Sequence, residues 1–78
     1  MKKITSRTDR TKLKIGTFLL DERSEIAYYR IETDYNGEYY LAKEFVLGYN
    51  DEDIIPTSRT VKLKEDDLIG MYIVGVHL

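Results

Sequence analysis

The fold is decided by the stretch Ile26-Ala-Tyr-Tyr-Arg-Ile-Glu-Thr33, Asp34-Tyr-Asn-Gly37 and Glu38-Tyr-Tyr-Leu-Ala-Lys-Glu-Phe-Val-Leu47. Its first and third parts are rich in aromatic and β-branched residues, which favour extended strands. The part between them carries two turn signals, an Asn-Gly pair and an aspartate followed three residues later by glycine. The stretch therefore predicts a β-hairpin over residues 26–47.

The length of the turn decides which residues of the two strands face each other. A three-residue loop that ends on Gly37 places Ile31 opposite Leu41, whereas a two-residue loop places Ile31 opposite Ala42. The first register gathers the apolar side chains on one face, and the second divides them between both faces. We therefore expect the three-residue loop. The core face then consists of Ala27, Tyr29, Ile31, Leu41, Phe45 and Leu47.

The other face of the hairpin is expected to carry polar and aromatic side chains. Its members are Tyr28, Arg30, Tyr40 and Glu44. The same register sends Lys43 to the core side, where its aliphatic stem is buried and its ammonium group has to reach water.

Three further segments have strand-like composition: Leu13–Leu20, Arg59–Lys64 and Met71–Val76. A short helical turn is expected near residues 65–69, and residues 48–58 are expected to form the longest irregular connection. No segment keeps a helical period over three turns. The sequence thus predicts a mostly β fold, a small five-stranded antiparallel barrel or strongly bent sheet of SH3-like or OB-like size. A mixed β fold with one short helix is the alternative.

The chain has 78 residues, enough for one hydrophobic core. It has no cysteine, so the fold relies on packing without disulfides or zinc ribbons. No stretch approaches the roughly 20 apolar residues that cross a bilayer. We expect a flexible basic arm over residues 1–12 and a single β domain over residues 13–78, in a soluble, cytoplasmic protein that does not bind membranes.

Charge is distributed unevenly along the chain. The first 14 residues carry six bases and one acid, a net charge of +5, and the other 64 residues carry six bases and 13 acids, a net charge of −7. A basic arm attracts phosphates through long-range electrostatics. The candidate phosphate contacts are Lys2, Lys3, Arg7 and Arg10. The alternative is a frayed, solvated terminus.

Catalytic and metal-binding patterns are weak. The single histidine, His77, lies next to the C-terminus, where a positioned general base is not expected. The acidic runs at residues 51–53 and 65–67 lack the ligand spacing and the central glycine of a calcium loop. We therefore expect no enzyme activity, no cofactor and no metal.

Seven tyrosines suggest a binding surface, because tyrosine is common in protein interfaces. In the first hypothesis the domain is a protein-binding module or a regulatory inhibitor whose partner has a basic surface. The proposed contact residues are Tyr28, Arg30 and Tyr40 on the hairpin and Asp51, Glu52 and Asp53 in an acidic loop. An edge strand would also allow a homodimer.

In the second hypothesis the domain binds nucleic acid. The basic arm would hold phosphates, and Tyr28 and Tyr40 would stack on bases, as small single-strand-binding barrels do. Net charge favours the first hypothesis, because a body of charge −7 repels phosphates and the sheet face offers only Arg30 as a clear cation.

Overall fold

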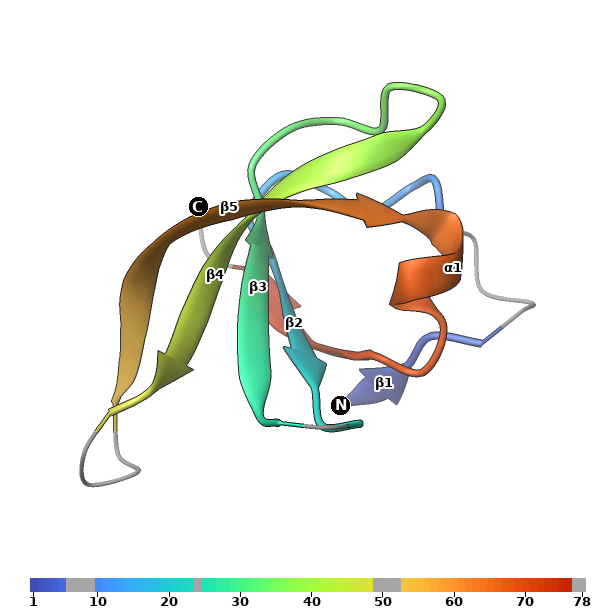
Figure 1. The fold of residues 1–78 in the computed structure, drawn as a ribbon. Coiled ribbons are helices and arrows are strands. Elements are labelled where there is room, and N and C mark those ends of the chain that lie inside the picture. The colour runs from blue at the N-terminus through green and yellow to red at the C-terminus, as the bar shows by residue number, and fades with distance from the viewer. Residues whose placement is uncertain (6–9, 24, 49–52, 77–78) are drawn as a thin grey trace.

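The computed structural model describes residues 1–5, 10–23, 25–48 and 53–76, and Figure 1 shows its fold. The described residues form six strands and one helical turn. They are β1 (Lys2–Lys3), β2 (Thr17–Asp21), β3 (Ala27–Ile31), β4 (Tyr39–Leu47), β5 (Ile54–Lys64), α1 (Glu65–Leu68) and β6 (Tyr72–Val76).

All six strands belong to one antiparallel sheet with the order β1-β6-β2-β3-β4-β5. The sheet is strongly bent but does not close into a barrel, and β5 and β1 form its two edges (Figure 1). The prediction of a mostly β fold with a strongly bent sheet and a short helical turn is confirmed. The sheet has one strand more than expected, because β1 has only two residues and so carries no strand pattern.

The first residues of the chain are part of the sheet. Lys2 and Lys3 pair with Ile73 and Tyr72 of β6. The N–H of Ile4 donates to the carbonyl of Met71 at 2.8 Å, and its side chain is fully buried. Residues 2–4 are therefore part of the sheet and its core.

The turn α1 is fastened at both ends. Its start is capped by Asp67, whose Oδ2 accepts the N–H of Lys64 at 2.9 Å. Its end is held by Arg23, which donates to the carbonyls of Asp67 and Ile69 and to the carboxylate of Asp21. The hydrogen bond from Arg23 lowers the pKa of Asp21, so this carboxylate stays charged and keeps Arg23 oriented.

The core lies on the inner, concave face of the sheet and is closed by α1 and the N-terminal segment. Its buried members are Ile4, Leu19, Ile31, Tyr40, Ala42, Leu63, Leu68 and Met71. Tyr40 is the largest of the fully buried side chains. Its hydroxyl is satisfied by backbone groups, since it donates to the carbonyl of Arg10 at 2.7 Å and accepts the N–H of Leu13 at 3.0 Å.

The hairpin adopts the register that places Ile31 opposite Ala42, so the prediction of Ile31 opposite Leu41 is wrong. In β3 the predicted faces hold, with Tyr29 and Ile31 inside. In β4 they are inverted. Tyr40, Ala42 and Glu44 lie on the inner face, and Leu41, Lys43 and Phe45 lie on the outer face.

The loop chemistry explains this register. Asn36 Oδ1 accepts the N–H groups of Glu38 and Tyr39, both at 2.9 Å, and Gly37 has φ +96°, so the chain reverses at Asn36-Gly37. Tyr35 then packs on Tyr40 with a ring-centroid distance of 5.2 Å and covers it. The loop thus favours Tyr40 inside.

The apolar residues of β4 that this register turns outward are also covered. Phe45 is only 8% exposed, because its ring lies 5.0 Å from that of Phe18. Leu20 is buried on the same outer face. Because both faces of the sheet bury apolar residues, the register does not have to place all of them on one face.

Strand β5 begins at Ile54, earlier than predicted, so residues 54–58 are extended rather than irregular. The β4–β5 pairing shifts between Lys43 and Phe45, and the two strands bend there. Glu44 lies at this shift. Its carboxylate accepts the hydroxyl of Thr57 at 3.1 Å and pairs with Arg59 at 3.5 Å.

We expect the substitution Tyr40→Phe to destabilise the domain. It leaves the partly buried N–H of Leu13 without its acceptor, which costs about 1 kcal/mol or more. The free energy of unfolding in urea measures the loss, and Tyr39→Phe, at a half-buried position, is the control. Equal stability of the two variants would contradict the placement of Tyr40.

Candidate functional site

The outer face of β3, β4 and β5 gathers cations that lie far apart in the sequence. Paired residues of neighbouring strands share a face, and successive residues of one strand alternate between faces. Since Ile31, Ala42 and Val61 lie inside, the residues next to them point outward. The outward residues of the three strands include Tyr28, Arg30, Tyr39, Leu41, Lys43, Phe45, Thr60, Lys62 and Lys64.

Four of these residues form a connected basic group, which we call the basic face: Arg30, Lys43, Lys62 and Lys64. Arg30 lies directly opposite Lys43. Lys62 is the diagonal neighbour of Lys43, about 7–8 Å away between Cα atoms, and Lys64 follows Lys62 on the same side of β5. Lys62 and Lys64 are exposed, and Arg30 and Lys43 are half-buried.

Aromatic rings lie among these cations. The ammonium of Lys62 is 4.9 Å from the ring centroid of Tyr39, and the guanidinium of Arg30 is 5.3 Å from that of Phe45. Tyr28 stands next to Phe45 across β3 and β4 and is half-buried. Lys62 and Arg30 are therefore held over rings, which orients them while they remain partly in contact with water.

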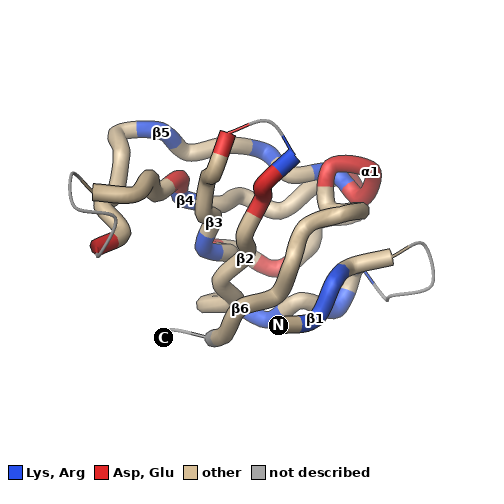
Figure 2. The backbone as a smooth tube through the Cα atoms, turned by 90° about the horizontal axis from the view of Figure 1, so that it is seen from below, with Lys and Arg blue, Asp and Glu red and all other residues tan. Residues whose placement is uncertain are grey.

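Acids are nearly absent from these three strands. Their only acid is Glu44, which lies on the inner face and is compensated by Thr57 and Arg59. Most acids of the described chain lie instead in turns and in α1, and Figure 2 shows α1 in red at one end of β5. The acidic net charge thus coexists with a basic sheet face. Glu32, just after β3, pairs with Arg30 at 3.0 Å, and Glu38, Glu65 and Asp66 line a pocket together with Lys64.

The structure brings together two of the predicted hairpin contacts. Tyr28 and Arg30 lie on the outer face as expected. Tyr40 does not, since it is fully buried in the core, and it is withdrawn as a contact residue. Asp53 is exposed and its carbonyl accepts the N–H of Gly48, whereas Asp51 and Glu52 lie outside the described residues.

The predicted phosphate contacts are dispersed. Lys2 and Lys3 are exposed in β1, at the far edge of the sheet, and the ammonium of Lys3 lies 5.9 Å from the ring centroid of Tyr72. Arg10 faces α1, with a nitrogen 3.4 Å from the carboxylate of Glu65. Arg7 lies outside the described residues.

Sequence reasoning missed Lys43, Lys62, Lys64 and Tyr39. A signal for two of them was present, because Val61-Lys62-Leu63-Lys64 alternates strictly and assigns both lysines to the polar face. Lys43 was lost through the wrong register of β4.

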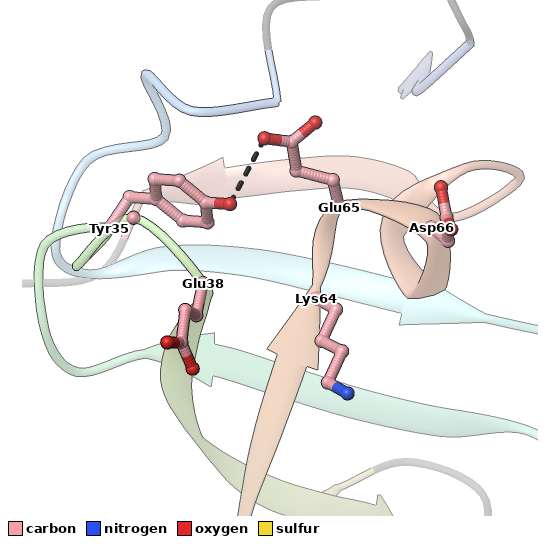
Figure 3. Close-up of a pocket in the computed structure, with 6 residues that line it drawn as sticks. Tyr35, Glu38, Lys64, Glu65 and Asp66 are labelled. Carbon is pink, nitrogen blue, oxygen red and sulfur yellow. Dashed lines mark hydrogen bonds between the residues drawn. The ribbon is translucent and has the colours of Figure 1, made fainter.

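A shallow pocket of about 450 Å³ lies beside the basic face, between the β3–β4 loop and α1 (Figure 3). Its lining residues are Tyr35, Gly37, Glu38, Lys64, Glu65 and Asp66. Tyr35 donates to Glu65 at 3.0 Å, and burial together with this bond raises the pKa of Tyr35. The phenol therefore stays protonated at neutral pH, and this contact fastens the loop to α1.

The described residues contain no cluster of three or more acids or histidines that could hold a metal ion. Within the same residues, no helix is long and apolar enough to cross a membrane.

Comparisons with known proteins give no relative. No protein-family model matches the sequence, and neither a curated protein nor a solved structure matches it.

Proposed function

We propose that the domain is a non-enzymatic binding module whose basic face binds single-stranded nucleic acid. The observation that carries the proposal is the cluster of Arg30, Lys43, Lys62 and Lys64 among aromatic rings on one acid-poor sheet face. Proteins that bind single strands combine a row of cations for the phosphates with aromatic rings on which bases stack.

Repulsion between cations of the basic face supports the proposal that this face binds a polyanion. Arg30 and Lys43 lie directly opposite each other, and like charges in such a pair destabilise a sheet. The contact of Arg30 with Glu32 offsets only part of this repulsion, since both side chains are about one-third exposed. Phosphates on this face would relieve it.

The rings favour a single strand over a duplex. Tyr28 and Tyr39 are half-buried, so each offers part of its ring to a ligand. An unpaired base can stack on such a ring, whereas the bases of a duplex are already stacked on one another. A protein with a basic surface is a poor partner for this face, because the two charges repel.

Salt-dependent binding of a labelled oligothymidine, followed by fluorescence anisotropy, tests the proposal. Four phosphate contacts predict that log K falls against log salt with a slope of about −2.8. The double variant Lys43→Gln and Lys62→Gln removes two contacts, so the slope should fall to about −1.4 and the affinity should drop at every salt concentration.

The matched control is the double variant Lys2→Gln and Lys14→Gln, which removes the same charge from exposed positions off the basic face. It should retain both slope and affinity. Equal losses of affinity in the two double variants would overturn the proposal. Binding would then depend on the net charge of the protein and not on the position of the basic face. Binding of polyglutamate that is as tight as that of the oligonucleotide and is equally weakened by Lys43→Gln would also overturn it, because the basic face would then bind an acidic protein.

We expect Lys43→Gln alone to stabilise the free domain. It removes the repulsion with Arg30, a gain of about 0.2–1 kcal/mol that shrinks as salt is added. The free energy of unfolding in urea, measured at low and high salt, gives this difference. A loss of stability at low salt would show that the two side chains do not repel each other.

A further inference from the structure

Strand β5 has an open edge with a defined set of backbone groups. It is the last strand of the sheet, and no described strand pairs with its outer side (Figure 1). With residues 54–64 it is also the longest strand. Such an edge can accept an extended segment as an additional strand.

The hydrogen bonds of β4 show which backbone groups of β5 point outward. The carbonyl of Leu41 accepts the N–H of Glu32 at 2.8 Å, so the backbone of Leu41 faces β3. Its partner on β5, Lys62, therefore forms a non-hydrogen-bonded pair with it, and the N–H and C=O of Lys62 point away from the sheet. Alternation gives the same direction to Thr60.

The open segment is short and bounded on both sides. The next outward N–H, that of Lys64, is already bound to Asp67 Oδ2. On the other side lie the register shift and Pro56, which has no N–H to offer. The free edge thus centres on Thr60 and Lys62.

Charge selects the occupant of this edge. From Ile54 to Lys64 the strand contains Arg59, Lys62 and Lys64 and no acid. A second copy of the chain would bring two such sets of cations into one two-stranded ribbon, which like-charge repulsion disfavours. A segment with carboxylates at alternate positions would instead complement Lys62 and Lys64.

We infer that the edge at Thr60–Lys62 binds an acidic, extended segment of another protein by strand addition. The backbone of Thr60 and Lys62 supplies the hydrogen bonds, and Lys62 and Lys64 select carboxylates. This site shares Lys62 and Lys64 with the basic face, but its hydrogen bonds come from backbone groups of the β5 edge, on which the proposed nucleic-acid binding does not depend.

The test compares Thr60→Pro with Thr60→Val in the full chain. Proline removes the outward N–H without removing a bond to β4, and valine keeps that N–H. Thermal unfolding establishes that both variants fold. The probe is a short, acetylated and amidated peptide of alternating glutamate and valine, and a peptide of alternating lysine and valine is the charge control.

We expect the acidic peptide to bind the wild type and Thr60→Val, and to bind Thr60→Pro at least about tenfold more weakly. The peptide should also slow hydrogen exchange of the Thr60 and Lys62 amides. Oligonucleotide binding should be equal in both variants, because their charges are the same, so failure of one proposal leaves the other testable.

Three results would overturn the inference: equal peptide binding by both variants, equal binding of the lysine peptide, or unchanged exchange at Thr60 and Lys62. Protection of these two amides that rises with protein concentration in the absence of peptide would also overturn it, because it would identify a second copy as the occupant.

Discussion

The structure depends on one pairing, that of Ile31 with Ala42 between β3 and β4. Because side chains alternate along a strand, this register decides the face of every residue in β4 and, through β4, of those in the paired part of β5. It places Tyr40 in the core, where its hydroxyl binds backbone groups of the N-terminal segment. It places Lys43 outside, next to Arg30. Core and basic face are thus two consequences of the same pairing.

Few residues are available in this small domain to bury the two faces of the central strands. The inner face is closed by α1, Ile4 and the Tyr35 loop. On the outer face Phe18 and Phe45 cover each other. Arg30 lies against these rings, and Lys43, Lys62 and Lys64 follow it toward β5. Arg23 and Asp67 hold the acidic α1 at the end of that strand. The acids of α1 therefore lie at the end of β5 beside Lys64, and not on the strands that carry Arg30, Lys43 and Lys62.

Alternation in the sequence correctly predicted the faces of β3, and the pattern Val61-Lys62-Leu63-Lys64 already contained those of β5. It failed in β4, because Leu41 and Phe45 are as apolar as Tyr40 and Ala42 and both faces bury apolar residues. The pattern also could not show that Arg10 and Leu13 supply backbone partners for a buried phenol. Three of the four residues of the basic face, Arg30, Lys62 and Lys64, were therefore predictable, and Lys43 required the correct register.

Proton NMR tests this register directly. Ile31 and Ala42 form a non-hydrogen-bonded pair, in which the Cα atoms are only about 4.5 Å apart and the Hα atoms face each other. The account predicts strong nuclear Overhauser effects between the Hα protons of Ile31 and Ala42 and between those of Tyr29 and Glu44. Pairing contacts of Ile31 with Leu41 and of Ala27 with Phe45 instead would contradict it, because they would turn Tyr40 outward and Lys43 into the core.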